Sequence, residues 1–155
     1  MKAKAILTYV LFCFCAVAVS LAAADGFLGT WKLNEAKSKL APGTTKNSTV
    51  VYAAAGDSMK ITIDGTGADG KPTHNEWTGK FDGKDYPVTG DPTSDTRSVT
   101  RVDDHTLHVV VKKGGKSTLT AHIVLSADGK TRTVTTTSTD AGGTKVTSTS
   151  IYDKQ

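Results

Sequence analysis

Two arginines stand four residues apart in a run that is typical of a β-strand. Because side chains alternate between the two faces of a strand, Arg97, Val99 and Arg101 share one face. A guanidinium binds a carboxylate or a phosphate through two parallel hydrogen bonds. If this face points inwards, Arg97 and Arg101 are predicted to anchor an acidic ligand; if it points outwards, they are solvated charges beside neighbouring aspartates.

His108 and His122 offer a second kind of chemistry. A three-residue hairpin loop around Gly114-Gly115 would place the two imidazoles directly or diagonally opposite each other, away from Leu107 and Leu119. Imidazole binds transition metals and titrates near neutral pH. The pair is therefore either a weak two-histidine metal contact or an exposed polar pair. Because no third ligand of suitable spacing accompanies it, we predict no metal centre and no cofactor.

Other patterns in the sequence carry little chemistry. The glycine-rich stretch 64–70 lacks the alternating acidic ligands and the final glutamate of an EF-hand loop, and a hairpin loop explains it. The sequence contains no Gly-x-Ser-x-Gly motif for a serine nucleophile. We predict that the protein is not an enzyme.

The elements that position these side chains are strands, because signals for tight turns recur along the chain. Asp-Gly-Lys occurs at 69–71, 82–84 and 128–130, and Asp-Gly pairs tolerate the positive φ of hairpin turns. Threonine, which suits half-exposed strands, supplies 24 of the 131 residues that follow Ala24. A helical turn is expected at 35–40, and about ten strands are expected near 30–34, 47–55, 58–64, 73–81, 85–89, 95–102, 105–112, 117–126, 131–139 and 144–153.

Short connections force successive strands to run antiparallel, and such a meander leaves two exposed edges unless the sheet closes on itself. The predicted fold is therefore all-β, an antiparallel up-and-down β-barrel of about 8–10 strands. A two-sheet β-sandwich is the alternative.

Residues 1–24 are predicted to be a signal peptide. Lys2 and Lys4 precede an almost wholly apolar run over 5–21, and Ala22-Ala23-Ala24 fits the small-residue cleavage pattern. An uncleaved membrane anchor is the alternative, since the apolar run is close to the length that spans a bilayer.

Cleavage after Ala24 would leave residues 25–155 as a single exported domain, periplasmic or extracellular. Both cysteines, Cys13 and Cys15, lie in the leader, so this domain would contain neither disulfides nor thiolates. Its formal charge would be +2, with acidic and basic residues interspersed. We expect no nucleic-acid partner, and membrane contact only through the leader before cleavage.

The segment Phe27-Leu28-Gly29-Thr30-Trp31 resembles the opening of the calycins, the lipocalins and fatty-acid-binding proteins, in which a Gly-x-Trp begins the first strand. The ending Ile151-Tyr152-Asp153-Lys154 resembles the closing strand of the fatty-acid-binding branch. In that branch an arginine two residues before the tyrosine joins it in gripping the ligand carboxylate, whereas here that position is Ser150. The resemblance implies a lipocalin-like barrel that binds a small, largely apolar ligand.

The resemblance and the strand pattern together predict the ligand site. Five aromatic residues are expected to line or close the cavity, with Arg97 and Arg101 as polar anchors for an acidic ligand; the five are Trp31, Trp77, Phe81, Tyr86 and Tyr152. Ordinary core packing is the competing interpretation of each aromatic. The alternative function is a packed, ligand-free barrel that acts through its Thr-rich exterior as a cell-envelope protein-interaction module. The sequence leaves the oligomeric state open.

Overall fold

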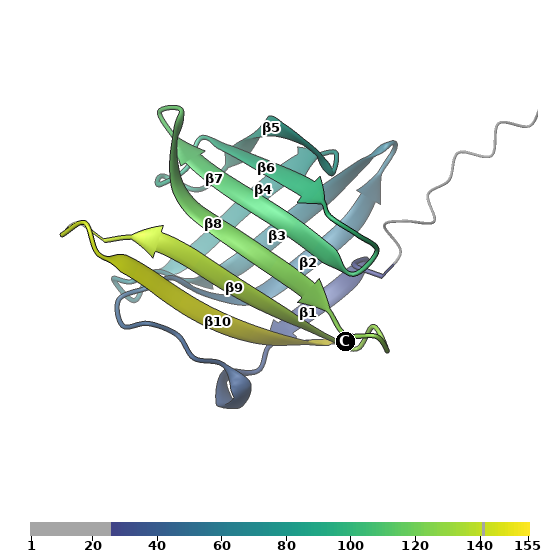
Figure 1. Ribbon diagram of the computed structural model, residues 1–155, viewed down its shortest axis with the longest axis horizontal. Coiled ribbons are helices and arrows are strands. Elements are labelled where there is room, and N and C mark those ends of the chain that lie inside the picture. Colours follow the sequence, from purple (N-terminus) through teal and green to yellow (C-terminus); the bar gives the residue numbers. More distant parts are fainter. Residues whose placement is uncertain (1–25, 141) are drawn as a thin grey trace, which may run out of the picture.

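The structure, a computed structural model, describes residues 26–140 and 142–155, so the predicted signal peptide lies outside the described residues. The described chain forms ten strands and one short 3-10 helix (Figure 1). In chain order these are β1 (Gly29–Leu33), η2 (Glu35–Lys37), β2 (Lys46–Ala55), β3 (Ser58–Thr66), β4 (Pro72–Gly79), β5 (Asp82–Thr89), β6 (Thr96–Arg101), β7 (Thr106–Lys113), β8 (Lys116–Leu125), β9 (Thr131–Thr139) and β10 (Lys145–Lys154).

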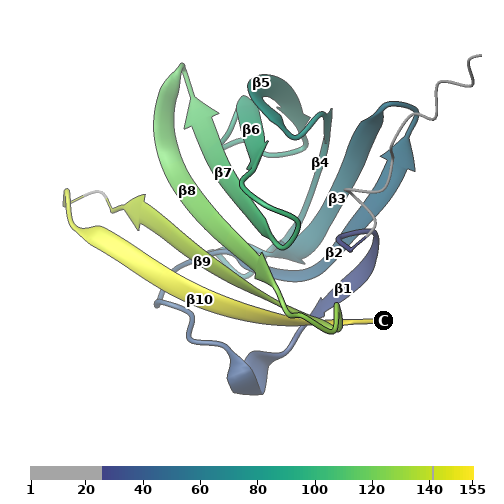
Figure 2. The ribbon, with the colours of Figure 1, turned by 45° about the vertical axis from the view of Figure 1, so that its right-hand side comes forward.

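Each strand pairs antiparallel with the next in sequence, and β1 pairs with β10, which closes the sheet into a barrel. Figure 2 shows β7 and β8 on one side of this barrel and β2 and β3 on the other. The up-and-down barrel is confirmed, and the sandwich alternative is wrong. The helical turn is shorter than expected, with Asn34 Oδ1 accepting a hydrogen bond from the Lys37 amide at its start. In the part of the chain that the structure describes, no helix is long and apolar enough to span a membrane.

The three Asp-Gly-Lys segments share one local hydrogen-bond geometry. In each, the aspartate Oδ1 accepts a hydrogen bond from the lysine amide two residues later, at 3.0–3.1 Å. Their glycines, Gly70, Gly83 and Gly129, have φ of +78°, +78° and +68°. At 69–71 and 128–130 this chemistry lies in the turns between strands, as the sequence predicts, and at 82–84 it lies at the start of β5, beside the register shift between Asp82 and Asp85.

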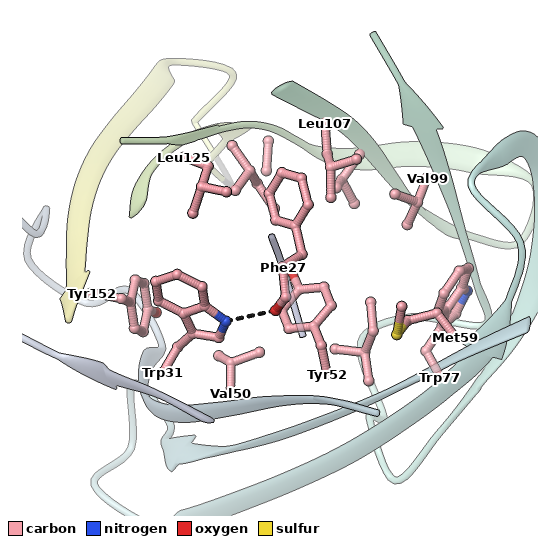
Figure 3. Packing of buried hydrophobic residues seen from close by; sticks show 14 of the residues in the cluster. Phe27, Trp31, Val50, Tyr52, Met59, Trp77, Val99, Leu107, Leu125 and Tyr152 are labelled. Atoms are coloured by element: carbon pink, nitrogen blue, oxygen red, sulfur yellow. Dashed lines mark hydrogen bonds between the residues drawn. The ribbon is translucent and has the colours of Figure 1, made fainter. Parts of the chain in front are cut away.

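Alternation along the strands directs apolar side chains into the barrel. Its most deeply buried large side chains are those of Phe27, Trp31, Trp77, Val99 and Leu107. The Trp31 indole N–H donates to the Phe27 carbonyl at 2.8 Å, which joins β1 to the segment that precedes it (Figure 3). Other core residues in Figure 3 include Val50, Tyr52, Met59, Leu125 and Tyr152.

The junction of β4 with β5 is the least paired part of the barrel wall. These strands share two residue pairs, Glu76 with Thr89 and Trp77 with Val88, whereas β3 and β4 share eight. Beyond these pairs the aromatic ring of Tyr86 packs on Gly79, where an added Cβ would lie 2.6 Å from ring atoms. Side-chain packing thus replaces much of the backbone ladder at this junction.

Candidate functional site

The structure answers the question of which way the arginine face points. Val99 is fully buried, and Arg97 on the same face is 7% exposed. Arg101 is half-buried, and its backbone pairs with that of the fully buried Leu107. Both arginines therefore point into the barrel, which places the two predicted polar anchors in the interior.

Arg97 lies among polar groups contributed by β4. Its Nη2 donates a hydrogen bond to Asn75 Oδ1 at 3.1 Å, and its carbonyl accepts one from the Trp77 indole N–H at 2.8 Å. Burial lowers the pKa of the Arg97 guanidinium, although Tyr52 and Asp91 act in the opposite direction. Arginine is the most basic side chain in proteins, so this guanidinium stays protonated in spite of its burial.

Arg132 on β9 is a third interior arginine and is 2% exposed. Its guanidinium carbon lies 4.5 Å from the ring centre of Tyr152, 5.0 Å from that of Tyr52 and 5.2 Å from that of Trp31. Two of its nitrogens, Nε and Nη1, are buried without a hydrogen-bond partner. The rings offset part of the cost of burying this charge, but they leave its N–H donors unsatisfied.

Tyr152 faces Arg132 directly, since the two residues are backbone partners of β10 and β9. The tyrosine hydroxyl donates to the carbonyl of Asn47 at 2.9 Å. Burial raises the pKa of Tyr152, and the nearby Arg132 partly counters that rise. The neighbouring strand thus supplies an arginine beside this tyrosine, where the sequence carries Ser150 in place of the fatty-acid-binding arginine.

Arg101 lies where β6 ends and contacts two aromatic rings. Its guanidinium carbon is 5.7 Å from the Phe27 ring centre and 5.6 Å from that of Phe81. Its Nη1 is buried without a hydrogen-bond partner. Burial lowers the pKa of Arg101, against the attraction of Asp103 and Asp104.

No acidic side chain neutralises these three arginines among residues 26–140 and 142–155. The ion pairs of the described chain join other residues, and none brings a carboxylate within 4 Å of an arginine. Taking a charge out of water costs several kcal/mol, roughly, unless a counter-charge or hydrogen bonds compensate. The interior therefore carries positive charge that the described chain leaves largely uncompensated.

The predicted aromatic residues form two groups. Trp77 packs against Phe81 and Tyr86, at ring-centre distances of 6.3 and 5.8 Å, and the Tyr86 hydroxyl donates to Asp82 at 3.0 Å. On the other side of the barrel, Trp31 and Tyr152 both lie against Arg132 (Figure 3 shows the two rings side by side). All five aromatics belong to or pack on the core, and their role in ligand binding stays a prediction.

Burial of the inward-facing side chains differs between the two ends of the barrel. At the end where β8 finishes, which we call the packed end, Phe27, Leu107 and Leu125 are 5% exposed or less. At the opposite end, the accessible end, inward-facing apolar residues stay partly exposed; they include Ile63, Val111, Leu119 and Val146. Solvent therefore reaches the inner wall from the accessible end.

A solvent-open hollow of about 470 Å³ lies outside the packed end, between the turns at 102–105 and 126–130. It contains none of the seven predicted site residues. Its lining includes Asp104, His105 and Asp128, so it is acidic where the interior is basic.

Sequence reasoning missed Arg132, Tyr52 and Asn75. The alternation of Arg132 with Val134 on β9 carries a signal for the arginine, since both occupy the inward parity of that strand. The signal is faint because the other side chains of β9 are threonines and one serine.

No family model and no curated protein matches the chain. Among solved structures, the chain is similar to EF1p2_mFAP2b bound to DFHBI, at 14% identity and a TM-score of 0.48, covering 86% of this chain and 97% of the other. It is also similar to a redesigned β-barrel, mFAP1, bound to DFHBI, at 19% identity and a TM-score of 0.45, covering 85% of this chain and 98% of the other. A third similar structure is lobster apocrustacyanin A1, at 14% identity and a TM-score of 0.43, covering 84% of this chain and 62% of the other. The closed ten-strand meander that opens with Gly29-x-Trp31 has the barrel architecture that the calycin resemblance of the sequence predicts.

Proposed function

We propose that this protein is a non-enzymatic binding protein whose barrel holds a small organic ligand with an apolar body and one acidic group. The observation that carries the proposal is the burial of Arg97 and Arg132 with no carboxylate of the described residues within 4 Å of either guanidinium. Natural proteins keep such charges where function requires them, because replacing them with apolar residues often improves stability.

The acidic group of the ligand would supply what the interior lacks. A carboxylate or phosphate placed at Arg132 accepts hydrogen bonds from Nε and Nη1, the two donors left without partners. It also brings the counter-charge, so binding removes the cost of the isolated guanidinium. Arg97 is already held by Asn75, and it contributes a second buried positive charge from β6.

The apolar body of the ligand would cover the partly exposed inner wall at the accessible end. Val111 and Leu119 lie opposite each other there, and burying such surface contributes about 25 cal/mol for each Å² removed from water. We further propose that the chain is exported by means of residues 1–24, for which N-terminal sequencing of the secreted protein should give Asp25 as the first residue.

A matched pair of probes tests the requirement for an acid. Laurate and its methyl ester share an apolar chain, but the ester lacks the charge. Titration of each, followed by Trp31 and Trp77 fluorescence, should show laurate binding at least about tenfold more tightly, as expected for charge-assisted hydrogen bonds. Arg132→Met should bring the two affinities together. Equal affinities in the wild type would contradict the proposed anchor, and a lack of response to either probe would favour the packed interaction module.

A further inference from the structure

The outer face of the barrel carries a pair of histidines that the proposed ligand site does not use. His108 on β7 and His122 on β8 are direct backbone partners, and both side chains are exposed. The three-residue loop expected from the sequence is wrong: Lys113 pairs with Lys116, which leaves a two-residue Gly114-Gly115 turn. The pairing of β7 with β8 shifts by one residue between Val111 and Lys112, and His108 and His122 stand directly opposite each other.

Direct opposition fixes the separation of the two Cβ atoms that carry the imidazoles. Partners in an antiparallel pair have Cβ atoms about 4.5–5.5 Å apart on the same face. One metal ion bound by two imidazole nitrogens at about 2.0–2.1 Å can bridge such a gap when rotation about χ1 and χ2 turns the two rings towards each other. The strand ladder holds both backbones in place, so little chain entropy is lost when the ion binds.

The surroundings of the pair are polar but uncharged. Thr100 on β6 is the partner of His108, and Thr135 on β9 is the partner of His122. Within the described residues, no carboxylate lies within 4 Å of either imidazole, in contrast to His74, whose Nδ1 lies 2.6 Å from Asp64 Oδ1. The nearest lysine on this face of β7, Lys112, is paired with Asp85 at 2.7 Å. Neither imidazole is therefore held by an acid. In its neutral form each ring has one nitrogen lone pair available for a metal ion.

The sequence predicts no metal centre at this pair, but the direct opposition of the two residues leads us to propose that His108 and His122 form a two-imidazole site for a divalent transition-metal ion on the outer wall of the barrel. Among such ions Cu²⁺ should bind most tightly, because affinity for nitrogen ligands rises along the first row to copper. Water and the flanking threonine hydroxyls complete the coordination. The two histidines lie on the outer face of the sheet, whereas the proposed ligand lies inside the barrel, so the metal site does not depend on that ligand.

The test uses the untagged full chain, freed of metal, in a buffer that does not chelate. Zn²⁺ is titrated while the imidazole C–H resonances are followed by NMR, and Cu²⁺ is titrated while EPR reports the number of bound nitrogens. We expect the resonances of His108 and His122 to shift together, to saturate at one ion per chain, and the EPR spectrum to show two nitrogens. His108→Ala and His122→Ala should each weaken Cu²⁺ binding at least about tenfold.

His105→Ala is the matched control, because His105 is an exposed histidine without a histidine partner. It should leave the affinity unchanged, and His122→Gln should reproduce the loss seen with His122→Ala. Two imidazoles must lose their protons before the ion binds, so the wild-type affinity should fall more steeply with decreasing pH than that of either one-histidine variant. Equal loss in His105→Ala, or one-histidine variants that bind as tightly as the wild type, would overturn the proposal. Circular dichroism confirms that each variant folds.

Discussion

Arg132 and Tyr152 stand directly opposite each other on β9 and β10, with the guanidinium carbon 4.5 Å from the centre of the phenol ring. The pair brings a buried cation and a buried hydroxyl together on neighbouring strands, although the two residues are twenty positions apart in the chain. Among the described residues no carboxylate lies within 4 Å of the Arg132 guanidinium, and its Nε and Nη1 lack hydrogen-bond partners. The proposed acidic ligand would therefore be held most strongly beside this pair.

Replacing Arg132 with Met should separate stability from binding. The variant removes a buried, incompletely satisfied charge, so the free energy of unfolding of the ligand-free protein should rise by about 1–2 kcal/mol. Affinity for laurate should fall at the same time. Urea unfolding measures the first effect, and Arg132→Lys, which keeps the charge, is the control. A loss of more than about 2 kcal/mol in Arg132→Met would mean that ring stacking and packing dominate at this position.

Asn75→Asp should supply an internal counter-charge to Arg97. A carboxylate in place of Oδ1, now 3.1 Å from Nη2, would form a buried ion pair and compete with an acidic ligand. We expect weaker laurate binding with the barrel intact. Asn75→Leu is the comparison: it leaves Nη2 without its acceptor and should cost about 1–3 kcal/mol of stability. Unchanged laurate affinity in Asn75→Asp would exclude Arg97 from the ligand site.

Gly79→Ala should destabilise the junction of β4 and β5. The new Cβ would lie 2.6 Å from the Tyr86 ring and from Trp77, and overpacking of this kind costs about 1–3 kcal/mol. Tyr86→Leu should recover part of the loss in a double-mutant cycle. Gly142→Ala is a suitable control, since its one near neighbour, Asp140 Oδ1, is 3.3 Å from the added atom. Equal urea midpoints for the two alanine variants would contradict this packing.

Asp95 should make part of the stability depend on acid pH. Its carboxylate accepts a hydrogen bond from the Gly114 amide and one from Lys113, both at 2.7 Å, and these lower its pKa, the Gly114 bond most strongly. A carboxyl group with a lowered folded-state pKa stabilises fully above its unfolded-state pKa of about 3.9, and this contribution is lost as the pH falls through the folded value.

Asp95→Asn should therefore lose stability at about pH 7, and the difference from the wild type should be smaller at about pH 2, because the wild-type carboxyl gains its proton as the pH falls towards the lowered pKa. Urea unfolding at the two pH values provides the comparison. If the difference in the free energy of unfolding between the wild type and Asp95→Asn is the same at both pH values, the contribution of the Asp95 contacts does not depend on the charge of the carboxylate.

The strands were predictable because their signals are local. The Asp-Gly-Lys turns and the alternation of apolar residues on β3 and β7 occur within single hairpins. The alternation of side chains along β6 predicted that Arg97, Val99 and Arg101 share one face. It did not predict whether this face points inwards or outwards, because the two charged residues favour the surface and Val99 favours the core. The register shift between β7 and β8 lies beyond local patterns, and without it the loop at Gly114-Gly115 was predicted one residue too long.

The most important interior residue escaped prediction for a related reason. On β9, threonines occupy both faces, so only Val134 marks the inner one, and Arg132 beside it resembles a surface residue. Its contacts with Trp31, Tyr52 and Tyr152 come from three other strands. Only the closure of β1 on β10 brings those rings together.

Native mass spectrometry of the protein purified without detergent, followed by organic extraction, tests the central claim most directly. We predict a reproducible extra mass on the wild type, recovered on extraction as an organic acid, and its loss in Arg132→Met. A wild-type mass equal to that of the bare polypeptide, or an extracted molecule with no acidic group, would contradict the assignment of the barrel interior as an anion-binding site.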